Sequence, residues 1–209
     1  MDRRVEGLSG WLTSHLEVAV KRPRPLSTLV VLAAAAATVL GLVSPAAAAA
    51  PYCGITWGSQ AKSADAYDTE SVVDVRAGRH ECYDRLVVVV GGQDISFGSY
   101  DVRYVPEITE DGSGHVVPVR GGAALQVVVR APAYDENGYA TYEPADRREV
   151  VDVRSFSTFR QVAWAGSFEG QTTLGVGVRA RLPFRVLTVQ GTPNSDDVPR
   201  LVIDVAHRW

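Results

Sequence analysis

The chain has 209 residues, of which 46% are hydrophobic and 22% charged, and 24 acidic against 21 basic residues give a net charge of −3 at pH 7. Five of the basic and three of the acidic residues fall in the first 49 positions, so the remaining residues carry a net charge of about −5. This balance excludes the strongly basic surface by which proteins bind nucleic acids, and we expect no nucleic-acid partner.

The N-terminal region has the order of an export signal. A basic patch around Lys21 precedes an apolar segment, residues 26–43, and a tail of small residues, 44–50. This order predicts a signal peptide with an extended N-terminal part over residues 1–49 and a single mature domain over residues 50–209. The apolar segment is about 18 residues long, near the lower limit for crossing a bilayer, so its retention as an uncleaved anchor stays open. No other membrane contact is predicted.

The two cysteines, Cys53 and Cys82, both lie in the exported part. An even number of cysteines in an oxidising compartment predicts a disulfide, here between Cys53 and Cys82. Closing a loop of about 30 residues would contribute on the order of 3–4 kcal/mol. The bridge would tie the polar segment of residues 50–79 to the strand that follows Cys82. A metal or redox pair lacks both the Cys-x-x-Cys spacing and nearby histidine ligands, so we predict no metal and no cofactor.

Short β-branched runs separated by turn residues follow along the chain. About nine strands at regular spacing predict an all-β fold, an antiparallel β-sandwich. Pro118 marks its run as an edge strand. The expected strands lie within residues 72–75, 85–90, 100–105, 116–119, 124–130, 149–154, 159–164, 172–179, 184–189 and 200–205.

The three histidines of the mature part do not have the spacing of a metal site. We expect His80 to pack near the disulfide. His115 follows a glycine turn and His207 lies near the C-terminus, which favours surface or capping roles for both. No Gly-x-Ser-x-Gly motif is present in the sequence to indicate a nucleophilic serine.

Two carboxylates, Asp84 and Glu169, are the pair to test for acid–base hydrolysis of a sugar. Each also has a structural interpretation. Asp84 could pair with Arg85 or with an arginine on a neighbouring strand, and Glu169 could hold a turn through backbone N–H groups. We therefore assign no catalytic residue and predict that the protein is not an enzyme.

Aromatic residues are the candidates for ligand binding. Tyr134, Tyr139 and Tyr142 lie among polar residues in one loop, and Trp57 and Trp164 could join the same surface. Tyrosine and tryptophan rings can stack on sugar faces while nearby polar groups bond the hydroxyls. Alternatively, the tyrosines anchor the loop to the sheet and the tryptophans belong to the core.

Six segments carry a family resemblance: CGITWGS (53–59), GRHECYDRLV (78–87), DGSG (111–114), SFEGQT (167–172), LPFRV (182–186) and LVIDV (201–205). Together they resemble the AMIN-like domain of secreted and lipoprotein bacterial proteins, and the resemblance extends from about Cys53 to Trp209. The family is similar to the AMIN module of cell-wall amidases, a β-sandwich associated with envelope targeting and peptidoglycan binding. The resemblance implies fold and location, while function does not follow from fold kinship alone.

We therefore expect a secreted bacterial protein, associated with the cell envelope, that binds peptidoglycan or another cell-wall glycan without catalysis. The alternative is a protein-interaction or assembly module of the envelope, which would use a sheet edge at residues 116–119. A small hydrolase is a third hypothesis, and it requires a cleft that holds Asp84, Glu169 or a histidine.

Overall fold

Short runs of β-branched residues form the strands of this fold. A computed structural model describes residues 50–65, 70–91, 97–193 and 195–209. Within these residues there are eleven strands and one short 3-10 turn, η1 (Tyr52–Gly54), so the predicted all-β fold is confirmed. Across the described ranges, no helix is long and apolar enough to span a bilayer. The predicted signal region, residues 1–49, lies outside the described residues.

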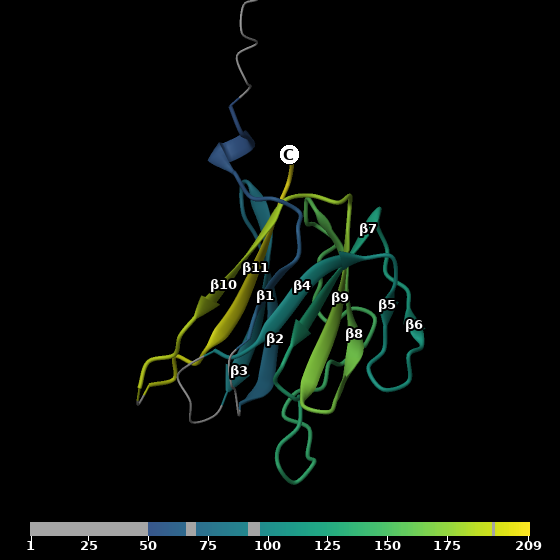
Figure 1. Ribbon diagram of the computed structural model, residues 1–209, viewed down its shortest axis with the longest axis vertical. Helices are drawn as coiled ribbons and strands as arrows, with labels where there is room; N and C mark the ends of the chain where they lie inside the picture. The colour runs from purple at the N-terminus through teal and green to yellow at the C-terminus, as the bar shows by residue number, and fades with distance from the viewer. Residues whose placement is uncertain (1–49, 66–69, 92–96, 194) are drawn as a thin grey trace, which may run out of the picture. The chain divides into compact units, whose positions relative to one another are not determined.

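Two antiparallel sheets pack face to face (Figure 1). The five-stranded sheet has the order β1 (Lys62–Ala64), β4 (Tyr100–Val105), β7 (Ala123–Val129), β9 (Gln171–Val178), β8 (Phe159–Phe168). The four-stranded sheet has the order β10 (Phe184–Val189), β11 (Arg200–Ala206), β3 (Tyr83–Gly91), β2 (Ser71–Arg79). A small hairpin pairs β5 (Ile108–Thr109) with β6 (Val116–Val117).

The core lies between the two sheets and follows the period of two expected of strands. In β3 the inward side chains of Leu86, Val88 and Val90 are fully buried. They belong to the same apolar cluster as Leu174 and Val176 of β9, on the opposite sheet. Each such side chain contributes about 1.5–3 kcal/mol on burial, so this cluster holds the sheets together.

The β5–β6 hairpin and the segment after it cover the outer face of the five-stranded sheet. A Cβ at Gly175 would lie 2.9 Å from Ile108, and one at Gly177 would collide with the backbone carbonyl of Arg120. Glycine at these two positions lets the covering backbone approach β9 closely. As a result, β9 is buried on both faces.

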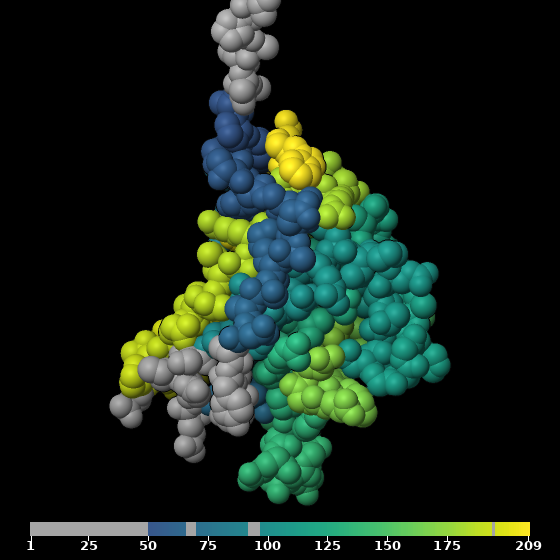
Figure 2. Space-filling model, in the orientation of Figure 1, coloured from purple at the N-terminus to yellow at the C-terminus, as the bar shows by residue number. Residues whose placement is uncertain are grey.

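Two segments close the flanks of the sandwich. Residues 50–65, blue in Figure 2, run between β10 and the five-stranded sheet: Gly58 accepts a hydrogen bond from Phe184 N–H (3.1 Å), and β1 pairs with β4. On the other flank, residues 130–158 connect β7 to β8. Val72 of β2 donates to the carbonyl of Pro132 (2.7 Å), and Val150 donates to that of Val162 in β8 (2.8 Å).

The expected strand at residues 149–154 is wrong. Asp152 accepts the backbone N–H of Arg154 (3.0 Å), and Phe156 donates to the carbonyl of Val153 (3.0 Å), so the chain bends there. Such aspartate turns compete with a strand ladder. The sequence interpretation also missed β1 and β5.

The predicted disulfide is present, with a Cα–Cα distance of 6.2 Å between Cys53 and Cys82. Cys53 lies in η1, and Cys82 comes immediately before β3. The bridge therefore fixes the start of the N-terminal segment to the four-stranded sheet, as expected.

Candidate functional site

The loop between β7 and β8 forms one wall of a hollow on the flank beside β8. This hollow, which we call the flank hollow, has a volume of about 290 Å³. That volume is just below the range of about 300–1,000 Å³ for small-molecule pockets. Its lining consists of Ala133, Ala140, Tyr142, Glu143, Pro144, Arg147, Trp164 and Ser167.

Two of the predicted aromatic residues meet in the flank hollow. The ring centroids of Tyr142 and Trp164 are 5.6 Å apart, and the rings are tilted by 51°. Trp164 is only 8% exposed and belongs to the core, so its indole is the floor of the hollow. Tyr142 is half-buried, and burial raises the pKa of its phenol, with the negative charge of Asp74 adding to the rise.

Polar groups stand beside this aromatic pair. Arg147 pairs with Glu110 at 2.9 Å and also accepts the backbone N–H of Trp164 at its carbonyl (2.7 Å). Hydrogen bonds from Ser113 and from Arg147 lower the pKa of Glu110, so this carboxylate holds the guanidinium in place at neutral pH. Glu143 is exposed at the same hollow. An aromatic floor with charged groups at its rim suits a polyhydroxylated ring.

The structure does not bring the other predicted aromatics into the flank hollow. Tyr134 accepts the backbone N–H of Gly170 at its hydroxyl (3.1 Å), which anchors the loop to the turn between β8 and β9. Tyr139 is 72% exposed in the loop that extends beyond the strand ends in Figure 1. Trp57 lies against Tyr83 on the four-stranded sheet, with ring centroids 5.7 Å apart.

Asp84 is a structural residue, although its partners differ from the expected arginine. Its carboxylate is fully buried and accepts the backbone N–H groups of Thr158 (2.5 Å) and Phe159 (2.9 Å), and Oδ1 lies 3.0 Å from Nε2 of His207. It thereby joins β3 to the start of β8 on the opposite sheet. The expectation of a surface or cap role for His207 is wrong, because this side chain is buried with Asp84. Arg85 pairs with Asp204 instead.

The two carboxylates of the hydrolase hypothesis lie at opposite ends of β8. Asp84 binds its first residue, whereas Glu169 follows its last one and sits in the turn with φ of 49°. At about 3.3 Å per residue, a ten-residue strand separates them by about 30 Å. Glycosidase carboxylates lie within about 10 Å of each other, so these two residues cannot act on one bond.

The other two histidines lie close to the surface. The imidazole of His80 stacks on Tyr83 at 4.6 Å, next to the disulfide as expected. His115 is exposed and lies 3.9 Å from Glu110. No group of three histidine, cysteine or carboxylate side chains that could hold a metal occurs in the described ranges.

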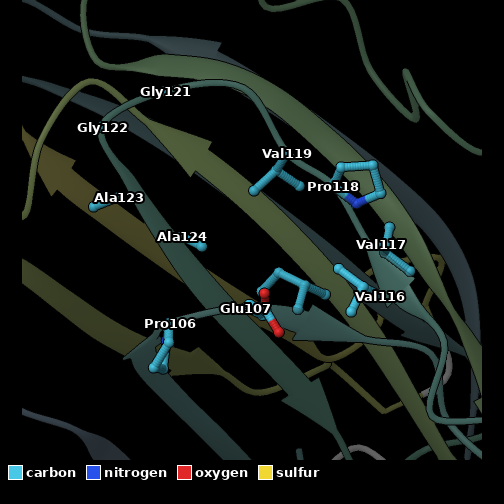
Figure 3. A pocket seen from close by; sticks show the side chains of 11 residues that line it. Pro106, Glu107, Val116, Val117, Pro118, Val119, Gly121, Gly122, Ala123 and Ala124 are labelled. Atoms are coloured by element: carbon cyan, nitrogen blue, oxygen red, sulfur yellow. The ribbon is translucent and has the colours of Figure 1, made fainter.

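A second hollow, of about 330 Å³, lies between the β5–β6 hairpin and the start of β7. Figure 3 shows Val116, Val119 and Pro118 on one side of it and Ala123 and Ala124 on the other. Glu107 is the charged residue of its lining, and Val116 is 54% exposed. The side chains that line this hairpin hollow are therefore mainly apolar, and the strand expected at residues 116–119 is the short β6, Val116–Val117.

Comparison with known protein families places the chain in one of them. The family model of the AMIN-like domain matches residues 70–207, which is more than half of the chain. No curated protein matches the chain. The matched range contains the described strands from β2 to β11.

Proposed function

Since the chain belongs to the AMIN-like domain family, we propose that it is an exported, non-enzymatic module of the bacterial envelope that binds cell-wall glycan in the flank hollow. The family is associated with the cell wall, and the disulfide fits an oxidising compartment. The proposal includes the signal region of residues 1–49 and a folded domain over residues 50–209. The single observation that carries it is the Tyr142–Trp164 pair at the floor of a hollow with charged groups at its rim.

The chemistry of binding follows from these side chains. The apolar face of a sugar ring would lie against Tyr142, with the edge of the Trp164 indole beneath it. Arg147 can donate to ring substituents because its guanidinium has five N–H groups and its ion pair with Glu110 uses one nitrogen. Glu143 can accept from sugar hydroxyls. A carboxylate on the glycan, as in peptidoglycan, would favour the arginine side of the hollow.

The test is retention of the full chain, exported so that its disulfide forms, on insoluble peptidoglycan with and without its attached wall polymers. The wild-type protein should bind saturably. Tyr142→Ala should weaken retention about tenfold, the usual scale for losing an aromatic anchor. Tyr139→Ala is the matched control, because it removes the same side chain from the exposed part of the same loop. Trp164 is not a suitable target, since its loss would disrupt the core.

Three results would speak against the flank hollow. If the wild-type protein stays in the supernatant, it does not bind this polymer. If Tyr142→Ala binds like the wild type, the glycan sits elsewhere. If Tyr139→Ala loses as much retention as Tyr142→Ala, the exposed tip of the loop is the contact and not the hollow.

A protein-interaction module is the second candidate function, and the hairpin hollow favours it. Its valines, prolines and alanines suit an apolar side chain of a partner, and Glu107 at its rim suits a cation. Val116→Asp would place a charge in this hollow. Loss of an envelope-protein partner in that variant, with retention on peptidoglycan unchanged, would support this candidate over glycan binding.

A further inference from the structure

The outer face of the four-stranded sheet carries a buried carboxylate between two arginines. The strand register places Arg185 of β10 and Arg85 of β3 directly opposite Asp204, which lies on β11 between them. Nε of Arg85 lies 2.6 Å from Oδ1 of Asp204, and Nε of Arg185 lies 2.8 Å from Oδ2. The carboxylate is fully buried, whereas the arginine side chains are 27% and 35% exposed.

These bonds leave part of both guanidinium groups available. Arg85 uses Nε and Nη2, and Arg185 uses Nε alone in its hydrogen bonds to other described residues. Each guanidinium has five donors, so several N–H groups remain for a ligand. Two positive charges also face one negative charge, which leaves one positive charge unbalanced.

Aromatic rings hold the arginines in position. The guanidinium carbon of Arg185 lies 4.4 Å from the centroid of Trp57, and that of Arg85 lies 5.3 Å from the centroid of Tyr83. Stacking occupies the face of a guanidinium and leaves the N–H groups at its edge free, since these lie in its plane. Because the hydrogen bond from Phe184 to Gly58 fixes the chain next to Trp57, the platform is ordered before any ligand arrives.

The unbalanced charge is local. Elsewhere on the same face, Arg76 pairs with Asp74 (3.3 Å) and Arg200 pairs with Asp197 (2.5 Å). The protein as a whole is negative. Among the described residues of this face, the two arginines at Asp204 therefore offer an anion positive charge that no second carboxylate balances.

We propose that Arg85 and Arg185, held by Asp204 and the rings of Trp57 and Tyr83, form a binding site for a single oxyanion group, a carboxylate or a phosphate. The planar forks of two guanidiniums match the oxygens of either group. An envelope polymer could present it as the carboxylate of an acidic sugar or as the phosphate of a wall polymer. The site goes beyond the proposed function, because it lies on a different surface from the flank hollow and can be tested without a glycan.

The experiment uses the full-length, disulfide-bonded protein at low ionic strength, where exposed charges are least screened. Binding is followed by NMR through the indole N–H of Trp57, assigned by a Trp57→Phe variant. One arm titrates inorganic phosphate and another N-acetylmuramic acid, a sugar with a carboxylate. N-acetylglucosamine, which lacks the carboxylate, is the neutral control. Saturable shifts with phosphate, with the acidic sugar or with both are expected, and they identify the preferred oxyanion.

Two variants separate binding from structure. Arg185→Gln removes one guanidinium and leaves Asp204 with its two bonds to Arg85, so the fold should persist while oxyanion affinity falls about tenfold or more. Arg76→Gln removes the same charge from the same face and should bind like the wild type.

The proposal is overturned if neither anion shifts the Trp57 signal saturably. It is also overturned if Arg185→Gln binds like the wild type, or if Arg76→Gln loses as much affinity. If Tyr142→Ala is retained on peptidoglycan like the wild type, the glycan site in the flank hollow is refuted, yet these titrations are unaffected, so the two proposals fail independently.

Discussion

Removing the Asp84 carboxylate tests whether this residue holds the two sheets together. Its loss in Asp84→Ala would leave the buried backbone N–H groups of Thr158 and Phe159 and the ring of His207 without their acceptor. Each unsatisfied buried group costs about 1–3 kcal/mol. The three groups together should therefore lower the free energy of unfolding by about 3–5 kcal/mol or more. This is a large share of the stability of a single domain, about 5–15 kcal/mol.

The assay is urea unfolding followed by tryptophan fluorescence, with the disulfide intact. Thermal unfolding is the second measurement. For a domain of this size, a loss of 1 kcal/mol lowers the melting temperature by about 2–4 °C, so Asp84→Ala should melt about 10 °C lower or more. Asp84→Asn should lose less, because the amide oxygen still accepts from the backbone. Glu169→Gln is the control, since this exposed turn residue should change the free energy of unfolding by less than about 0.5 kcal/mol. An Asp84→Ala protein as stable as this control would refute the structural role.

Three further predictions concern the disulfide and two half-buried tyrosines. Replacing Cys53 and Cys82 by alanine should lower the free energy of unfolding by about 3–4 kcal/mol in urea titrations, because the unfolded chain regains the conformational freedom that the bridge removes over a separation of 29 residues. An unchanged urea midpoint would contradict this. Tyr104→Phe should cost about 1–3 kcal/mol, measured in the same way, since its hydroxyl donates to the carbonyl of Leu182 (2.9 Å) and accepts its N–H (3.1 Å). Burial raises the pKa of Tyr142 above the unfolded value of about 10, so the unfolded state releases this proton first and stability should fall as pH rises above 10. In Tyr142→Phe that part of the alkaline loss should disappear, and an identical pH profile would count against it.

Most of the sandwich follows from the period of two in the sequence, and the failures have local causes. The runs around Leu86, Leu125 and Leu174 alternate or are continuously apolar, and they are core strands. Residues 149–154 are also rich in valine, yet Asp152 within them and Asp146 just before them bend the backbone. The strand at Lys62–Ala64 has no apolar pattern, and it forms because it pairs with β4. Pattern alone cannot report a strand that its neighbour creates.

The candidate sites were less accessible to prediction, because they depend on strand order. The aromatic residues were identifiable by type, but only the fold shows that Tyr142 meets Trp164 while Trp57 lies on the other sheet. Arg85 and Asp204 are 119 residues apart and meet because β11 lies between β10 and β3. A register of this kind brings together residues that no sequence spacing connects.

The positions of the two proposed sites favour a polymer over a small ligand. The side-chain hydroxyl of Thr141, next to the flank hollow, donates to the backbone carbonyl of Val72. Val72 is the strand partner of Val90, near the end of β3. Arg85 lies five residues earlier on that strand, which corresponds to about 17 Å. One sugar cannot bridge this distance, whereas an extended chain can contact both sites. Binding at one site then raises the effective concentration at the other, so two weak, shallow contacts suffice for firm retention on an insoluble wall.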